Sequence, residues 1–219
     1  MPAFPHFTGD RTMTERMAQL FANAPDAAGY IRAHLDRTAE VLEALDPQPV
    51  AQLLQQIEAL CAAGKTLYVC GNGGSASVAG AWVNDLSANS VVKGKPGFRV
   101  LSLADSGAVV TALANDISFE EVFAEQLRAW MQPGDLVLGM SCSGNSENVL
   151  RAIRYANENG GQTAAICGFD GGKLKDLAQL SILVESSQDE YGPVEDAFSV
   201  IMHAVVGYLT MSRGRMLKH

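Results

Sequence analysis

Two short loops rich in glycine and serine contain the residues of this chain that are best suited to chemistry. They read GNGGSA at 71–76 and SCSGNS at 141–146, and each lies between an apolar run and a stretch with a helical pattern. The first N–H groups of a helix have no partner within it and carry a partial positive charge, so they bind an anion without any lysine. Serine hydroxyls supply further donors. We therefore predict that the two loops bind one anionic ligand, and that its anionic group is a phosphate.

The first loop also allows two other interpretations. Gly71, Gly73 and Ala76 satisfy the dinucleotide-binding pattern G-x-G-x-x-A. That pattern requires an acidic residue about 20 positions later to hold a ribose, and Asp105 lies well beyond this spacing. The loop could also be a structural turn without a ligand. A nucleotide P-loop is excluded because no Gly-Lys-Ser/Thr follows, and the second loop favours a cradle for the phosphate of a sugar phosphate.

The chain around these loops predicts an α/β fold. Apolar runs predict strands at 66–70, 98–103, 135–140, 162–167 and 181–184. Helical patterns predict helices at 27–45, 50–63, 74–88, 107–115, 119–130, 145–159, 172–178 and 193–212. Continuously apolar strands separated by helices are typical of a parallel sheet that is covered on both faces. Such sheets bind ligands beyond the carboxyl ends of their strands, which is where both loops lie.

Composition narrows the class of protein further. The 219 residues are 47% apolar and 18% charged, as in an ordinary globular protein. The formal net charge of −8 argues against a nucleic-acid partner, because phosphate backbones require a basic face. We expect no apolar run to be long enough to cross a membrane, and the N-terminus lacks the apolar core of a signal peptide, so we expect no membrane partner.

The organisation of the chain indicates a single domain. We expect residues 1–26 to be irregular and residues 27–219 to form one domain. The four cysteines have no metal-binding spacing, and we interpret them as reduced thiols of a cytoplasmic protein. They are Cys61, Cys70, Cys142 and Cys167.

Four motifs together resemble the sugar isomerase (SIS) domain family. They are CGNGGSA at 70–76, TALAND at 111–116, SCSGNSENVLRAI at 141–153 and GFDGGKL at 168–174. Within that family the chain is similar to the phosphoheptose isomerase group from about Tyr30 to Leu209. The resemblance implies a flavodoxin-like three-layer sandwich with a five-stranded parallel sheet and an N-terminal helical pair. It also implies a homotetramer with active sites at subunit interfaces, and conversion of sedoheptulose 7-phosphate to an aldoheptose 7-phosphate.

The resemblance also implies which residues bind the substrate. The phosphate is expected on the hydroxyls of Ser141, Ser143 and Ser146. The family commonly has a threonine where this chain has Cys142, so one hydroxyl is lost at a position that still faces the ligand. The other implied substrate-binding residues lie on the first loop, after the second strand and on the last helix: Asn72, Gly73, Gly74, Ser75, Asp105 and Glu195.

The chemistry of an aldose–ketose isomerase needs a base and an acid. A carboxylate can remove the proton next to the carbonyl, and a histidine can move a proton between the two oxygens of the enediol. The family's glutamate base matches Asp85, whose side chain is one methylene shorter, and its histidine matches His203. Without the resemblance, Asp85 is interpreted as a solvated carboxylate and His203 as a packed residue of an apolar helix.

Some family members bind zinc through a histidine, the base glutamate, a glutamine and the last-helix histidine. The matching residues here include Ala81, which cannot bind a metal, and Phe198 stands where the family has a second histidine on the last helix. Asp85, Glu195 and His203 could still form an open three-ligand zinc site, since Glu195 and His203 are eight residues apart and share a helical face. As an alternative, Glu195 is an acidic residue that complements the dipole of the last helix.

Two functions therefore remain open at the level of sequence. The first is an isomerase that acts on a sugar phosphate, and the second is a non-catalytic module of the same fold that binds a phosphosugar or a partner protein. Ala81 and Phe198 favour the module, whereas the carboxylate at Asp85 and the imidazole at His203 favour the enzyme. We expect the enzyme.

Overall fold

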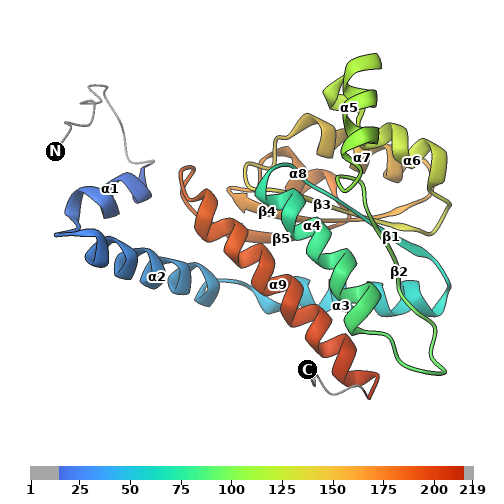
Figure 1. The fold of residues 1–219 in the computed structure, drawn as a ribbon, viewed down its shortest axis with the longest axis horizontal. Helices are drawn as coiled ribbons and strands as arrows, with labels where there is room; N and C mark the ends of the chain where they lie inside the picture. The colour runs from blue at the N-terminus through green and yellow to red at the C-terminus, as the bar shows by residue number, and fades with distance from the viewer. Residues whose placement is uncertain (1–14, 215–219) are drawn as a thin grey trace.

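The computed structural model describes residues 15–214, which form a five-stranded parallel sheet between two layers of helices (Figure 1). The strand order is β2-β1-β3-β4-β5, and every neighbouring pair is parallel. The strands are β1 (Thr66–Cys70), β2 (Arg99–Ser102), β3 (Leu136–Ser141), β4 (Gln162–Phe169) and β5 (Leu180–Glu185). The predicted α/β architecture is confirmed, and each predicted strand is present within two residues at either end.

Helices cover both faces of the sheet. One face packs against α3 (Pro47–Ala62), α4 (Gly74–Asn84) and α9 (Tyr191–Ser212), with Trp82 and Phe198 fully buried between them. The opposite face packs against α6 (Ala124–Trp130), α7 (Glu147–Glu158) and α8 (Gly172–Leu177). All residues of β1 and β3 are buried, which explains why both read as uninterrupted apolar runs.

The remaining helical segments lie outside these two layers. α5 (Gly107–Asp116) follows β2, projects from the body of the protein and has no buried residue (Figure 1). A π-helical turn, Asp85–Asn89, continues α4, and a short 3-10 turn, Phe119–Glu121, precedes α6. The predicted helix at 74–88 is therefore an α-helix that continues into a π-helical turn.

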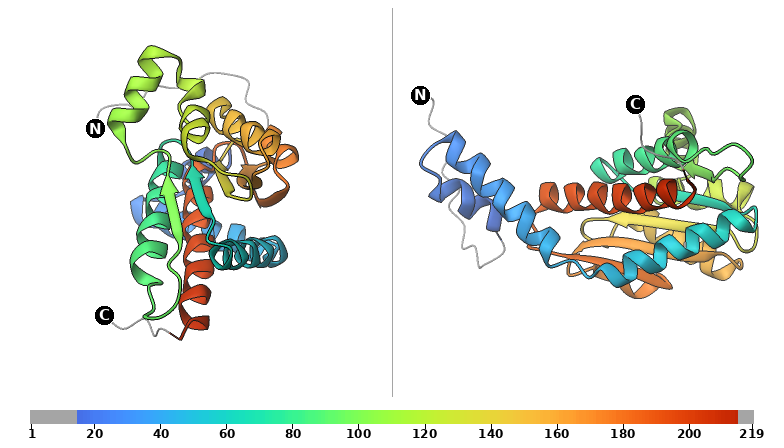
Figure 2. Two further views of the ribbon diagram at one scale, coloured as in Figure 1. Left: turned by 90° about the vertical axis from the view of Figure 1, so that its right-hand side faces the viewer. Right: turned by 90° about the horizontal axis from the view of Figure 1, so that it is seen from below.

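The N-terminal arm consists of α1 (Arg16–Asn23) and α2 (Ala27–Glu43) and extends away from the sheet (Figure 2). The prediction of an irregular segment over 1–26 is wrong for residues 16–23, while residues 1–14 lie outside the described part of the chain. The carboxylate of Asp189 accepts hydrogen bonds from the backbone N–H groups of Arg16 and Met17, at 2.9 and 2.8 Å. A helix cap supplied from so far along the chain leaves no local sequence signal.

α9 is the core helix of the fold. By length and composition α9 could span a membrane. The prediction that no apolar run is long enough for this is therefore wrong for α9. Half of its most apolar window is buried inside the protein, against the sheet and its neighbours α3 and α4. Its apolar side chains therefore serve packing within the fold.

An ion pair joins the arm to the start of α9. The Arg37 guanidinium donates to both carboxylate oxygens of Glu190, at 2.6 and 3.0 Å, and the Glu190 side chain is completely buried. Burial raises the pKa of Glu190, but hydrogen bonds from Arg37 and from the Ser187 amide outweigh it and hold the pKa below its ordinary value of 4.5.

We expect Glu190→Gln to lower the free energy of unfolding by about 2 kcal/mol, because it leaves the partly buried Arg37 charge with only the exposed Glu40 carboxylate as a counter-charge. Urea denaturation measures this. Glu40→Gln is the matched control, since Glu40 bonds to the same guanidinium at 3.0 Å but is exposed, and its loss should cost less than about 0.5 kcal/mol.

The same ion pair should make the stability depend on pH, because the pKa of Glu190 is lower in the folded state than in the unfolded state. The pair contributes its full stabilisation above the unfolded-state pKa of Glu190 and loses it as the pH falls through the folded-state pKa. A difference between wild type and Glu190→Gln that stays constant down to acid pH would contradict this account.

Candidate functional site

The two predicted loops meet at one edge of the sheet. β1 and β3 are neighbours, and the chain leaves β1 for one side of the sheet and β3 for the other. Their carboxyl ends therefore flank the crevice where the strand order reverses, which is the usual ligand position in this architecture. Gly73 has a φ of 55°, a conformation that favours glycine, and it turns the chain from β1 into α4.

A cavity of about 130 Å³ lies between these loops. The structure brings seven of the predicted substrate-binding residues to its wall: Asn72, Ser75, Ser141, Cys142, Ser143, Ser146 and Glu195. Met140 and Tyr191 also line it, and sequence reasoning missed both. Met140 is an inward-facing residue of a buried strand, and Tyr191 begins α9, so neither belongs to a recognisable binding motif.

Hydrogen bonds within the second loop hold its hydroxyls in place. The Ser141 hydroxyl lies 3.1 Å from that of Ser146 and accepts the Gly144 N–H at 3.1 Å. Ser143 accepts the Asn145 N–H through its own hydroxyl at 3.2 Å. Ser146 occupies the N-cap position of α7, but its side chain makes no capping hydrogen bond. The start of α7 thus offers N–H groups to an anion at the point where the hydroxyls gather.

A reciprocal amide pair ties the two loops together. The side chain of Asn72 donates to Asn148 at 2.9 Å, and the side chain of Asn148 donates back at 2.8 Å. Asn148 is buried, and its oxygen also accepts the Val149 N–H. It follows the second loop directly in the sequence, but only its contact with Asn72 shows that it positions the first loop.

Glu195 brings a negative charge to the same cavity. Its carboxylate lies against Gly74, where a Cβ atom would overlap it, so the absence of a side chain at Gly74 permits this position of the carboxylate. The thiol of Cys142 lies 3.9 Å from the Glu195 oxygen. Burial, together with that charge, raises the pKa of Cys142 to about 11, so the thiol stays neutral. No lysine or arginine among residues 15–214 lines this cavity, so within the described chain the hydroxyls and the helix start hold the anion.

The two predicted catalytic residues lie close to each other, away from the cavity wall. The His203 Nε2 atom is 3.6 Å from the Asp85 carboxylate. The histidine side chain is 67% exposed and the aspartate side chain 15%, so His203 is not the packed core residue of the alternative interpretation. Asp85 also accepts a hydrogen bond from the Asn84 side chain at 2.8 Å. An accessible carboxylate–imidazole pair of this kind can exchange protons with a bound substrate.

The other predicted site residues lie around the cavity without lining it. Gly73 turns the first loop and Gly74 makes room for Glu195, so both have a structural reason to be glycine. Asp105 is exposed after β2, and its carboxylate faces Gly80 on α4. The structure therefore does not bring Asp105 together with the serine hydroxyls within one chain.

The residues present do not fit a zinc site within one chain. Among residues 15–214, no group of three or more histidine, cysteine, aspartate and glutamate side chains is arranged to hold a metal ion. Asp85 and His203 approach each other, but Glu195 faces Gly74 and Cys142 instead. Phe198 is fully buried and Ala81 has no donor atom, so neither can complete the set. The predicted three-ligand zinc site therefore finds no support in this geometry.

Comparisons with known proteins agree with the fold and the loops. The SIS domain family matches residues 29–168, and the chain belongs to this family. Individual relatives of the chain identify its group within the family. The chain is 37% identical to a phosphoheptose isomerase of Helicobacter pylori strain Shi470, over 78% of this chain and 87% of that protein. It is 32% identical to a phosphoheptose isomerase of Chlorobium phaeobacteroides, over 88% of each. The chain thus falls in the phosphoheptose isomerase group of the SIS family.

A solved structure supports the same architecture. The phosphoheptose isomerase GmhA from Neisseria gonorrhoeae matches with a TM-score of 0.77 at 24% identity, over 85% of this chain and all of that one. At this identity the likeness concerns the fold, and it confirms the flavodoxin-like three-layer arrangement with its helical N-terminus.

We expect Glu195→Gln to bind inorganic phosphate about tenfold more tightly than wild type at neutral pH, because removing a like charge from the cavity relieves about 1.4 kcal/mol of repulsion. Isothermal titration calorimetry measures this affinity. Asp196→Asn removes the same charge from the exposed neighbouring residue and should change the affinity less than twofold. Weaker binding by Glu195→Gln would contradict this account, because it would show that the carboxylate supports the bound phosphate instead of repelling it.

Zinc binding gives a separate test of the site geometry. We expect the protein to retain no stoichiometric zinc after dialysis, since the described residues supply only a two-residue pair. Elemental analysis after gel filtration measures this, with and without added zinc. One zinc ion per chain that is lost in His203→Ala would contradict the expectation.

Proposed function

We propose that this protein is an isomerase that interconverts the ketose and aldose forms of a sugar phosphate, with sedoheptulose 7-phosphate as its substrate. The observation that carries the proposal is the Asp85–His203 pair, 3.6 Å apart, on the same two helices that begin at the serine-lined cavity. The names and identities of its relatives support an enzyme over a non-catalytic module.

The course of α4 and α9 relates the cavity to the pair. Both helices begin at the cavity, where Gly74 meets Glu195, and they pack side by side as far as Asp85 and His203 (Figure 1). Eight residues separate Glu195 from His203, which is about 12 Å along a helix axis. A substrate with its phosphate in the cavity would therefore present atoms far from that phosphate to the pair. A ketose with the carbonyl near one end and the phosphate at the other meets this requirement.

The residues then have distinct roles in the proposed reaction. Ser141, Ser143 and Ser146, with the start of α7, bind the phosphate and fix one end of the sugar. The Asp85 carboxylate removes the proton from the carbon next to the carbonyl, which gives an enediol, and returns it to the neighbouring carbon. His203 moves a proton between the two oxygens of the enediol, so that neither oxygen carries a full negative charge.

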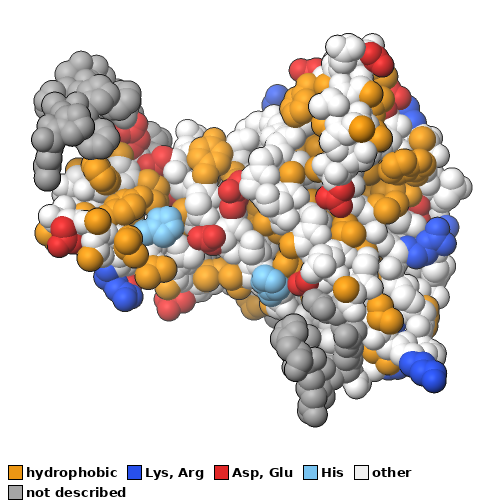
Figure 3. Space-filling model, viewed as in Figure 1, with side chains coloured by type: hydrophobic (Ala, Val, Ile, Leu, Met, Phe, Trp, Pro, Cys, Tyr) orange, Lys and Arg blue, Asp and Glu red, His pale blue; other side chains and the backbone are white. Residues whose placement is uncertain are grey.

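We also propose that the protein works as a homo-oligomer in the cytoplasm. In one chain His203 is largely exposed, and proton transfer benefits from exclusion of water. Apolar side chains gather on the N-terminal arm, where Phe21, Ile31 and Leu35 are exposed (Figure 3). Val200 and Tyr208 are exposed on α9, where they line a cavity together with residues of α3. Contacts between copies along these surfaces would cover the apolar side chains and enclose the reacting end of the sugar.

The test follows the entry of solvent deuterium at the carbon next to the carbonyl of sedoheptulose 7-phosphate. We expect Asp85→Asn and His203→Ala each to lower exchange at least about a hundredfold while the affinity for the sugar phosphate stays within a few-fold of wild type. Asp176→Asn, an exposed change on α8, is the matched control and should keep full activity.

Two outcomes would contradict the proposal in different ways. Wild-type protein that binds sugar phosphates but exchanges no deuterium with any heptose, pentose or hexose phosphate would establish the binding module. Full activity in both Asp85→Asn and His203→Ala would instead leave an isomerase whose catalytic residues are assigned wrongly.

A further inference from the structure

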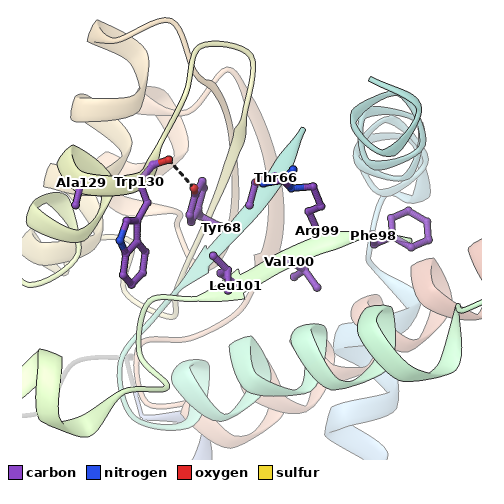
Figure 4. Close-up of a pocket in the computed structure, with 8 residues that line it drawn as sticks. All are labelled: Thr66, Tyr68, Phe98, Arg99, Val100, Leu101, Ala129 and Trp130. Atoms are coloured by element: carbon purple, nitrogen blue, oxygen red, sulfur yellow. Dashed lines mark hydrogen bonds between the residues drawn. The ribbon is translucent and has the colours of Figure 1, made fainter. Parts of the chain in front are cut away.

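The outer edge of β2 is open, and a large cavity lies over the sheet face next to it. β2 is the last strand on its side of the sheet and pairs only with β1 among the described residues. The cavity measures about 740 Å³, and it shares no residue with the serine-lined cavity. Its lining residues are Thr66, Tyr68, Phe98, Arg99, Val100, Leu101, Ala129 and Trp130 (Figure 4).

The lining shows on which face of the sheet the cavity lies. Successive residues of a strand point to opposite faces of the sheet. Val100 belongs to the core cluster on the α4 and α9 side, whereas Leu101 is in register with Tyr68 of the opposite cluster. Arg99 and Leu101 are in register with Thr66 and Tyr68 of β1 and share their face of the sheet, on which α6 lies. The cavity therefore lies over this face of β1 and β2 and reaches the outer strand, beside which an added strand would lie.

The side chains along this edge favour an extended apolar segment. Leu101 is 44% exposed and Trp130 is 48% exposed. The hydroxyl of Tyr68 donates to the Trp130 carbonyl at 3.0 Å and so fixes the end of α6 beside the strand (Figure 4). Phe98, just before the strand begins, packs against the core cluster of the opposite face (Figure 4). Apolar and aromatic side chains at this spacing can pack against alternate residues of a neighbouring strand.

Arg99 adds a charge to the edge. It is exposed and makes no ion pair or side-chain hydrogen bond with any residue in the described range 15–214. The other arginines near α6, Arg128 and Arg151, are both paired with glutamates. An unpaired arginine beside an open strand selects a partner that carries a carboxylate.

We propose that the outer edge of β2 binds an extended segment of a partner protein by strand addition, with apolar residues at alternate positions and a carboxylate that pairs with Arg99. Backbone hydrogen bonds to β2 supply affinity, and Leu101, Trp130 and Arg99 supply selectivity. A second copy of this chain is a poorer occupant, because two-fold pairing of β2 with itself brings two Arg99 charges to the same short interface. This inference does not depend on the proposed isomerase activity.

The experiment selects random short peptides displayed on phage against the full chain and measures the selected peptides by isothermal titration calorimetry. We expect alternating β-branched or aromatic residues with at least one aspartate or glutamate. Arg99→Glu should weaken their binding at least about tenfold, and replacing the peptide carboxylate with lysine should restore binding to that variant. Arg32→Glu, the same charge reversal on the exposed face of α2, is the matched control and should have no effect.

The role of the backbone has its own test. N-methylation of alternate peptide amides that face β2 should weaken binding about tenfold or more, while methylation of the intervening amides should not. Selected peptides that bind equally well to Arg99→Glu, or that tolerate methylation at every position, would overturn the proposal. Concentration-dependent association of wild-type chains that Arg99→Glu alters would show instead that a second copy occupies this edge.

Discussion

The close approach of α9 to α4 at Gly74 is the contact on which the arrangement of the site depends. Because Gly74 has no side chain, Glu195 can lie against the first turn of α4, and both helices then start at the same cavity. Their parallel course carries Asp85 and His203 to within 3.6 Å of each other. A side chain at Gly74 would displace the Glu195 carboxylate from the first turn of α4 and so change the charge next to the cavity.

The second constraint is electrostatic. The part of the chain that the structure describes places no lysine or arginine in the wall of the cavity between the loops. The attraction of this cavity for an anion therefore depends on four serine hydroxyls and the open start of α7. Glu195 opposes that attraction. Such a cavity holds an anion by directed hydrogen bonds, and the Asn72–Asn148 pair keeps its two loops in register. The selectivity of the site therefore depends on geometry more than on net charge.

Local sequence patterns were sufficient to predict the sheet and its loops. Buried parallel strands read as apolar runs, and glycine and serine mark the turns that follow them. Contacts between distant segments were not predictable in the same way. α1 was missed because its cap, Asp189, lies elsewhere in the chain, and Tyr191 was missed because it reaches the cavity from the start of α9.

In the candidate site, too, local patterns predicted some features and contacts between distant segments determined the others. The serine loops followed from the residues themselves, whereas the pairing of Asp85 with His203 followed only from resemblance to the SIS family. Spacing along α9 placed Glu195 and His203 on one helical face but gave no information on how far apart their side chains would lie. A crystal structure of the protein with sedoheptulose 7-phosphate would test the account most directly. The account predicts the phosphate within hydrogen-bond distance of Ser141, Ser143 and Ser146 and the ketose carbonyl beside Asp85 and His203. A phosphate bound outside the two loops, or a carbonyl remote from that pair in every subunit, would contradict it.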